Sequence, residues 1–309
     1  RFGQDVINHY TYCLHGDGDI QEPISQGAIA MAGHWGLGKL INYYDSNNAQ
    51  ISGKVSRSDS TNYVKMYEAH GWHVQEIDGH DKDEIRSAIR QAQMEIHKPS
   101  VIIGNTIMAK GSANMEGDHN THGAPLPPEE ILNTKINLEL DPNEFFYLPN
   151  DVLDSFREGF DYAKKEVSAW DLAVKNRMED ASFKKNWKIA FSGELPEFKI
   201  PFYESGQNVA TRKVWGAFIE SLAKQHLTLV GGSADLEPSN VTSGFAEMVG
   251  DFSIENNSGR NFAYGVREFP MGAMNNGIAQ HGGLKVFGAT FFVFADYERP
   301  ALRLRALQN

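Results

Sequence analysis

Cysteine is almost absent from this sequence of 309 residues, in which Cys13 is the single example. One thiol cannot form an internal disulfide, so the composition fits a reducing compartment, and we expect a cytoplasmic protein. Cys13 lies in a strand-like run, TYCL, where a small core residue is more common than a catalytic nucleophile. We therefore predict a core position for Cys13.

Long apolar runs are also missing. No stretch approaches the roughly 20 consecutive apolar residues that span a bilayer. The first residues, RFGQDVINHY, lack the apolar segment of a signal peptide. We expect no membrane partner. Because the chain has no initiating methionine and starts close to a strand-like run, we also expect it to be part of a longer protein.

Positive charge is scarce as well. Lys and Arg number 29 against 40 Asp and Glu, which gives a formal net charge of -11. This balance argues against nucleic acid as a partner, because binding to a phosphate backbone depends on many cationic contacts. A phosphorylated small molecule would have to be held by a few local cations and backbone amides.

Up to about residue 128, short β-branched or aromatic runs alternate with segments whose apolar residues recur at helical spacing. Strands are predicted at YTYCLH (10–15), KLINYYD (39–45), WHVQEI (72–77) and VIIGNTIM (101–108), and helices at PISQGAIAMAGHWG (23–36) and DKDEIRSAIRQAQMEIH (81–97). Such alternation favours a parallel sheet covered by helices, and ligands bind these sheets at the carboxyl ends of the strands.

Residues 129–204 differ, because they are highly charged, helical in pattern and without a strand signal. A second α/β segment follows at residues 205–309. Its predicted strands are LTLVGG (227–232) and LKVFGAT (284–290), and its predicted helices are TRKVWGAFIESLAKQ (211–225), MGAMNNGIAQHGG (271–283) and FFVFADYERPALRLRAL (291–307). The pattern predicts an α/β protein with two parallel-sheet domains, 1–128 and 205–309, joined by a helical connector.

The clearest chemical motif is Gly16-Asp17-Gly18 after one predicted strand, with Asn47 after the next. Glycines allow the backbone to approach phosphate oxygens, and Asp17 offers a hard oxygen to a divalent cation. Asn47 can add an amide oxygen, and the backbone carbonyl of Ala49 a third ligand. A GDG triplet alone is common in turns; the paired strand ends favour a site for a cation and a diphosphate. The Walker-type phosphate loop is absent.

The segment GDGDIQEPISQGAIAMAGHWGLGKLINYYDSNNAQISG resembles the thiamine-diphosphate fingerprint of transketolases. GWHVQEIDGHD, THGAPL, TRK, GGSADLEPSN, YGVREF and TFFVFADY continue the resemblance in the same order almost to the last residue. It implies a diphosphate and metal domain at 1–128, a connector at 129–204 and a pyrimidine domain at 205–309. It also implies transfer of a two-carbon ketol unit between sugar phosphates in the pentose phosphate pathway, with Mg²⁺, Ca²⁺ or Mn²⁺ as the metal.

Two catalytic residues are implied by the same resemblance. Glu268, in YGVREF, matches the glutamate that hydrogen-bonds the aminopyrimidine ring and so activates the cofactor; this role requires a largely buried carboxyl. Without the resemblance, Glu268 beside Arg267 would be expected in a surface ion pair. His122, in THGAPL, matches a histidine that contacts both the diphosphate and the substrate oxygens, where an imidazole can move protons.

Further cofactor and substrate contacts are implied. Ile51 matches an apolar residue that holds the cofactor bent, and Asp235 an acidic residue on the cofactor side. Arg212 and Ser239 match contacts to the terminal phosphate of the sugar, for which guanidinium and hydroxyl donors are suited. The remaining candidates share an i, i+3, i+6 spacing that can line one helix face as a pocket for the pyrimidine ring: Phe291, Phe294 and Tyr297.

The resemblance also implies a homodimer, with the diphosphate on one subunit and the pyrimidine on the other, and with Glu22 at the contact between subunits. Other hypotheses remain open at this stage. The chain can be a truncated, inactive module for cofactor binding or dimerisation. It can also belong to a related thiamine-diphosphate enzyme, such as a formaldehyde transketolase or deoxyxylulose-phosphate synthase.

Overall fold

The computed structural model describes residues 2–192 and 199–308. By compactness the chain divides into one unit of residues 9–170 and a second unit made of residues 1–8 and 171–309. Each unit is built on a parallel sheet with helices, which confirms the α/β class predicted from the sequence. No helix among the described residues is long and apolar enough to cross a membrane.

The unit of residues 9–170 contains a four-stranded sheet in which all neighbours are parallel. Its order is β1 (Thr11–Gly16), β2 (Leu40–Ser46), β6 (Ser100–Asn105) and β5 (His73–Asp78). All four strands were predicted from their β-branched and aromatic runs. Register pairs Gly16 with Asp45 and Ser46 with Asn105, so the carboxyl ends of the strands lie along one edge.

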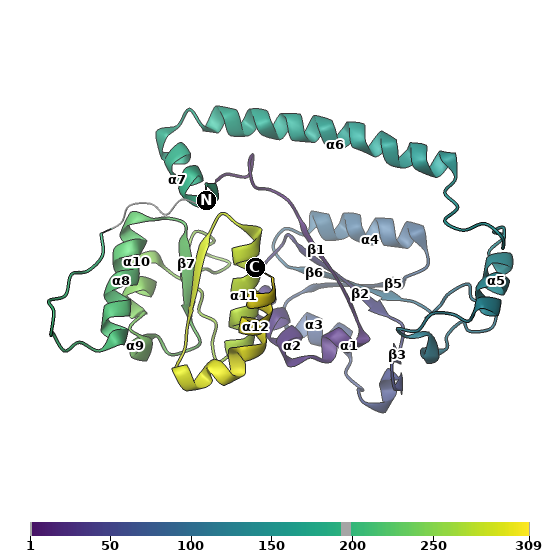
Figure 1. Ribbon diagram of the computed structural model, residues 1–309, viewed down its shortest axis with the longest axis horizontal. Helices are drawn as coiled ribbons and strands as arrows, with labels where there is room; N and C mark the ends of the chain where they lie inside the picture. Colours follow the sequence, from purple (N-terminus) through teal and green to yellow (C-terminus); the bar gives the residue numbers. More distant parts are fainter. Residues whose placement is uncertain (1, 193–198, 309) are drawn as a thin grey trace. The chain divides into compact units, whose positions relative to one another are not determined.

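Helices cover both faces of this sheet (Figure 1). One face carries α1 (Asp17–Gln21), α2 (Pro23–His34) and α3 (Tyr63–Ala69), and the other carries α4 (Lys82–Met94). Val101 packs with Tyr67 and Trp72 on the first face, while Ile102 packs with Ala88 on the second. Because successive side chains of a strand point to opposite faces, the continuous apolar run of β6 serves both cores.

Shorter elements follow the strands of this unit. They are β3 (Ala49–Gln50), β4 (Gly53–Lys54), η1 (Val55–Arg57), η2 (His119–Thr121) and α5 (Pro128–Asn137). The predicted core position of Cys13 is wrong, because β1 is an edge strand within this sheet and Cys13 is exposed.

Helices α6 (Asn150–Arg177) and α7 (Ala181–Phe191) make up most of the predicted helical connector. Residues 193–198 of that segment lie outside the described residues. The amino-terminal segment packs on the end of this connector, where Phe2 contacts the ring of Trp187 edge to face at 5.3 Å. Arg177 donates to both oxygens of Asp5, at 2.6 and 2.7 Å, and so ties the same segment to α6.

The second parallel sheet consists of β7 (Leu229–Ser233) and β8 (Lys285–Ala289). Its helices are α8 (Thr211–Gln225), α9 (Glu237–Asn240), α10 (Ser243–Val249), α11 (Glu268–His281) and α12 (Ala295–Leu307), with a short turn η3 (Phe292–Phe294) before α12. Ile219, Phe245 and Phe287 form its core. The buried guanidinium of Arg260 donates to backbone carbonyls of Ala223, His226 and Leu229, which satisfies the carboxyl end of α8.

Candidate active site

The predicted cation ligands lie together at the carboxyl edge of the four-stranded sheet. Asp17 follows β1 and Asn47 follows β2, which are neighbouring strands. The backbone N–H of Asn47 donates to Oδ2 of Asp17 at 3.2 Å, and the backbone N–H of Ala49 donates to Oδ1 of Asn47 at 3.0 Å. The structure therefore brings all three predicted metal-binding residues into one cluster.

Asp17 is a buried carboxylate, only 5% exposed. The hydroxyl of Tyr44 donates to its Oδ1 at 2.6 Å, and burial, followed by this hydrogen bond, raises the pKa of Tyr44 and keeps the phenol a donor. Among the described residues no Lys or Arg forms an ion pair with Asp17. Because burying an ionised carboxyl with only neutral donors costs free energy, a cation at this position would stabilise the site.

The glycines of the motif leave space beside Asp17. A Cβ atom added at Gly18 would meet no atom within 4 Å, and one added at Gly16 would meet only Oδ2 of Asp19, at 3.8 Å. Internal packing therefore does not require these glycines. Asn48, between the two ligands, has φ +57°, a left-handed conformation that costs free energy and clusters at functional sites. These features fit close approach of a diphosphate to the backbone.

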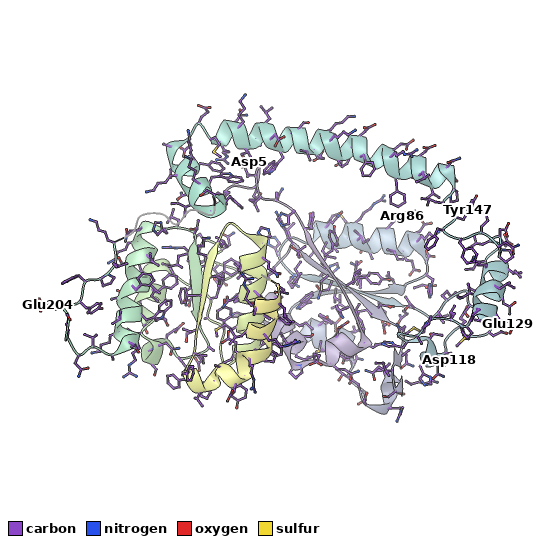
Figure 2. The ribbon with its side chains drawn as sticks, in the orientation of Figure 1. Asp5, Arg86, Asp118, Glu129, Tyr147 and Glu204 are labelled. Atoms are coloured by element: carbon purple, nitrogen blue, oxygen red, sulfur yellow. The ribbon has the colours of Figure 1, made fainter. Side chains whose placement is uncertain are left out.

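Ile51 and His122 are exposed on two neighbouring loops of the same unit. Ile51 lies in the turn between β3 and β4 and is 78% exposed. His122 ends the turn η2, which packs beside β4. Asp118, labelled in Figure 2, caps η2 by accepting from the N–H of Asn120 at 2.9 Å. Both predicted side chains are thus free to contact a ligand.

The donor set suits Mg²⁺ held together with a diphosphate. The described residues contain no group of three His, Cys, Asp or Glu side chains that could bind a metal. One carboxylate, one amide oxygen and one backbone carbonyl leave several coordination positions, which Mg²⁺ normally fills with phosphate oxygens and water. Asp17, Asn47 and Ala49 therefore fit the cation that the sequence predicts.

A second group of predicted residues gathers at the carboxyl edge of the β7–β8 sheet. Asp235 follows β7, Phe291 follows β8, and Ser233 pairs in register with Ala289. Asn261 forms a parallel bridge with Gly231, so the segment that leads to Glu268 runs in the same direction. Asp235 has φ +61°, a further left-handed residue at a strand end.

Glu268 is the first residue of α11 and is 9% exposed, as the predicted role requires. A surface ion pair with Arg267 does not form, because the Arg267 guanidinium donates to the backbone carbonyl of Tyr264 at 3.1 Å. Glu268 is thus a buried carboxyl at the start of a helix, and Arg267 does not form an ion pair with it.

The three predicted aromatic residues form a row of neighbouring rings, stacked between Phe291 and Phe294 and tilted by 58° between Phe294 and Tyr297. The ring centroids of Phe291 and Phe294 are 5.8 Å apart with an interplanar angle of 24°, and those of Phe294 and Tyr297 are 6.0 Å apart. One helix over 291–307 was expected, but η3 precedes α12, which begins at Ala295. The three rings are nevertheless neighbours, and Phe291 is 39% and Tyr297 66% exposed.

The remaining predicted residues are exposed. Arg212 lies in the first turn of α8, and Ser239 lies on the adjacent helix α9. Helices α8 and α9 contact each other, which is compatible with a shared phosphate. Glu22 separates α1 from α2, and its carbonyl accepts from the N–H of Ser25 at 2.9 Å.

Some residues that organise the cation cluster were not predicted from the sequence. Tyr44 contacts Asp17, and Asp45 accepts from the hydroxyl of Thr106 and from the Asn47 amide at 3.3 Å. The signal available was the segment YYDSN itself, whose polar residues continue a buried strand. Which of its side chains point toward Asp17 depends on strand register, which no spacing reveals.

Two family profiles match the chain in succession. "Transketolase, thiamine diphosphate binding domain" covers residues 1–196, and "Transketolase, pyrimidine binding domain" covers residues 207–309. This chain belongs to the transketolase family. The resemblance stated from the motifs is thereby confirmed, together with the thiamine-diphosphate class of cofactor.

Relatives of known name agree with this assignment. The chain is 42% identical to a transketolase of Bacillus subtilis (strain 168) over 99% of its length and 46% of that relative, and 41% identical to one of Geobacillus stearothermophilus over 100% of its length and 47% of that relative. The chain thus spans about half the length of these transketolases.

Solved structures are similar as well. A transketolase from Leishmania mexicana superposes with a TM-score of 0.92 at 36% identity, over 97% of this chain and 45% of that one. A Pichia stipitis transketolase described as a complex with sedoheptulose-7-phosphate gives a TM-score of 0.90 at 33% identity, over 96% of this chain and 45% of that one. These scores confirm the predicted two-domain α/β fold.

Proposed function

We propose that the chain is part of a transketolase that reversibly transfers a two-carbon ketol unit from a ketose phosphate to an aldose phosphate. The observation that carries this proposal is the hydrogen-bonded cluster of Asp17, Asn47 and Ala49, in a chain that belongs to the transketolase family. A cytoplasmic enzyme of the pentose phosphate pathway is the corresponding biological role.

The cluster at β1 and β2 would hold the divalent cation and the diphosphate. Asp17 and the side chain of Asn47 would supply two oxygens, and the carbonyl of Ala49 a third; Mg²⁺ is the expected ion, with Ca²⁺ or Mn²⁺ as substitutes. The backbone at Gly16 and Gly18 would face the diphosphate oxygens, since no side chain there blocks access. Ile51, which is exposed, would support the bent cofactor from below.

The second group would receive the pyrimidine ring. Thiamine diphosphate, when bound, supplies the electron sink that allows a carbon–carbon bond beside a carbonyl to break and form. Glu268, which is buried, would hold a proton at a ring nitrogen of the pyrimidine. The neighbouring rings of Phe291, Phe294 and Tyr297 would orient the pyrimidine, and Asp235 would border it.

Three exposed residues would act on the sugar phosphates. His122 would exchange protons with the substrate oxygens and contact the diphosphate. Arg212 and Ser239 would bind the terminal phosphate, because a guanidinium can donate two parallel hydrogen bonds to phosphate oxygens. The sedoheptulose-7-phosphate bound to the Pichia stipitis relative supports a sugar phosphate of this class.

We further propose a homodimer in which each cofactor is shared between two subunits. Asp17 and its neighbours would come from one subunit and Glu268 from the other, with Glu22 close to the contact. The division into a diphosphate domain at 1–128, a connector at 129–204 and a pyrimidine domain at 205–309 belongs to this proposal.

The test is a ketol-transfer assay on the purified full-length protein. With thiamine diphosphate and Mg²⁺, xylulose 5-phosphate and ribose 5-phosphate are expected to yield a seven-carbon ketose phosphate and a three-carbon aldose phosphate. Asp17→Asn is expected to lower the rate by at least about 100-fold, with Asp83→Asn on the exposed face of α4 as a matched control. A folded protein without transfer would overturn the proposal.

Assays with other donor and acceptor substrates would distinguish a transketolase from the related thiamine-diphosphate enzymes. Transfer to formaldehyde in preference to aldose phosphates would indicate a formaldehyde transketolase. Condensation of pyruvate with glyceraldehyde 3-phosphate would indicate a deoxyxylulose-phosphate synthase. If the chain is an inactive module, calorimetry would detect metal-dependent binding of thiamine diphosphate, while the assays would show no turnover of any of these substrates.

A further inference from the structure

Tyr44 and Asp45 are successive residues of β2, and each contacts a different proposed cation ligand. The Tyr44 hydroxyl donates to Asp17, while Oδ2 of Asp45 accepts from Nδ2 of Asn47 at 3.3 Å. Because successive side chains of a strand point to opposite faces of the sheet, the end of β2 contacts the two ligands from two sides. Asp45 is half-buried, and no Lys or Arg in the described part of the chain forms an ion pair with it.

The other oxygen of Asp45 is bound by Thr106, which follows β6. The Thr106 hydroxyl donates to Oδ1 of Asp45, and the Thr106 backbone N–H donates to the carbonyl of Ser46 at 3.1 Å. The Thr106 methyl packs so closely on Gly79 that a Cβ atom added there would clash with it. Thr106 is therefore fixed by its backbone and by its methyl group, and the orientation of the Asp45 carboxylate does not depend on Asn47 alone.

A side-chain amide has two ends of opposite hydrogen-bonding character, and the neighbours of Asn47 distinguish them. The NH₂ group can only donate, and the oxygen can only accept. As a carboxylate, Asp45 can only accept; the backbone N–H of Ala49, whose nitrogen lies 3.0 Å from Oδ1 of Asn47, can only donate. With the amide reversed, its oxygen would face the carboxylate and its NH₂ group would face the N–H of Ala49. Both contacts would be repulsive, so a single orientation fits.

We propose that Asp45 is a positioning residue that presents the oxygen of Asn47, rather than its NH₂ group, to the cation. An amide oxygen has two lone pairs, so Oδ1 can accept from Ala49 and still bind Mg²⁺. A reversed amide would turn N–H bonds, with their partial positive charge, toward the cation. This inference rests on the proposed cation site at Asp17, Asn47 and Ala49, and it adds the residue that selects which amide atom the site uses.

Titration calorimetry of the purified full-length protein with Mg²⁺, in the presence of thiamine diphosphate, tests the proposal. In Asp45→Asn the new side chain can accept or donate, so both orientations of the Asn47 amide find a partner. The dissociation constant for Mg²⁺ is therefore expected to rise by about 10-fold, the lower end of the usual effect of losing a residue that orients a metal ligand.

Asp78→Asn is the matched control for charge. Asp78 ends β5 at the same edge of the sheet and is exposed, so the variant also removes one carboxylate from this edge. Because salt screens an exposed charge, the dissociation constant for Mg²⁺ should change by less than about 2-fold at physiological ionic strength.

Thr106→Val separates orientation from charge. The variant keeps every charge of the cluster and removes only the hydroxyl that binds Asp45. The dissociation constant for Mg²⁺ should rise by about 2-fold to 10-fold, the usual effect of one hydrogen bond. The Mg²⁺ concentration for half-maximal ketol transfer should rise in parallel in Thr106→Val and in Asp45→Asn. At saturating Mg²⁺ both variants should reach the wild-type rate, because the affinity for the cation changes and the reacting groups do not.

Three results would overturn the positioning role. One is an Asp45→Asn protein that binds Mg²⁺ as tightly as wild type. Another is unchanged affinity in Thr106→Val while Asp45→Asn and Asp78→Asn weaken binding equally, since charge alone would then explain the effect. The third is a loss of rate that saturating Mg²⁺ does not restore. Calorimetry detects binding without turnover, so a protein that binds Mg²⁺ but transfers no ketol unit would refute the proposed function and not the role of Asp45.

Discussion

The hydroxyl of Tyr44 is the direct link between a buried strand and the proposed cation ligand. Tyr44 is 3% exposed, stacks on His15 at 5.1 Å, and donates to Asp17 at 2.6 Å. A partner of this kind fixes the orientation of a metal-binding carboxylate and commonly changes metal affinity when it is removed. Tyr44 is thus expected to influence cation binding through Asp17, without contacting the cation itself.

Replacement of Tyr44 by Phe is expected to weaken Mg²⁺-dependent binding of thiamine diphosphate by about 10-fold to 100-fold, because Asp17 loses its shortest hydrogen bond. Calorimetric titration of the full-length protein measures the effect. Tyr10→Phe is the control. It removes a hydrogen bond to the backbone carbonyl of Gln93, a residue that is far from the motif in sequence. Equal affinity in both variants would show that Tyr44 does not position Asp17.

The thiol of Cys13 provides a second prediction at this scale. Cys13 is exposed on an edge strand, but its thiol is partly shielded from solvent. This partial burial, and secondarily the charge of Asp19, raises the pKa of Cys13. Alkylation by iodoacetamide at neutral pH should therefore be slower than for a cysteine in the unfolded chain, because the thiolate is the reactive form. Mass spectrometry before and after urea treatment checks this, and equal rates would contradict it.

At the scale of elements, the loop after β6 is held by one carboxylate. Glu130, on α5, is 7% exposed and accepts from the Ser112 hydroxyl at 2.5 Å and from the backbone and side-chain N–H groups of Asn114 at 2.8 and 2.9 Å. These hydrogen bonds lower the pKa of Glu130 to about 2 from its ordinary value of 4.5. The loop that ends in His122 therefore depends on an ionised side chain.

Glu130→Gln should consequently lower thermal stability at neutral pH. A carboxyl with a lowered folded-state pKa contributes stability above its unfolded value, so the contribution is lost as pH falls from about 4.5 to about 2. Thermal unfolding of wild type and variant between pH 2 and 7 tests the sign. Glu129→Gln, the exposed neighbour on α5 (Figure 2), is the control, and a pH-independent difference would contradict the prediction.

Ile51, in the β3–β4 turn, is expected to contribute to cofactor binding but little to the stability of the fold. Because Ile51 is 78% exposed, Ile51→Ala should change the free energy of unfolding by less than about 0.5 kcal/mol. Loss of an apolar contact to the bent cofactor should weaken thiamine diphosphate binding by about 10-fold. Urea unfolding and calorimetry on the same samples distinguish the effects; a destabilised variant with unchanged affinity would assign Ile51 to folding.

At the scale of the whole molecule, the proposed homodimer makes a prediction by complementation. Asp17→Asn and Glu268→Gln homodimers should each be inactive. A mixture that exchanges subunits should regain about one quarter of wild-type activity, because half of the dimers are mixed and each contains one intact site of two. Activity after co-refolding measures this. If the mixture stays inactive, each cofactor uses both residues of a single subunit.

The sequence alone predicted the strands of the two parallel sheets and their longer helices, because apolar periodicity and turn residues act locally, whereas short helices such as α3, α9 and α10 were not predicted. The motif around Asp17 and Asn47 was also recognisable, since parallel strands place their carboxyl ends at one edge. The domain limits at 128 and 204 stay a prediction, while compactness divides the chain near residues 9 and 171.

Which side chains contact one another depends on the tertiary structure. The contact of Tyr44 with Asp17 and the edge position of Cys13 depend on strand register, which joins residues far apart in the chain. Local patterns specify backbone conformation, whereas burial and electrostatic coupling depend on the distances between elements. The chemistry of each carboxyl is therefore set by its neighbours in space rather than by its neighbours in sequence.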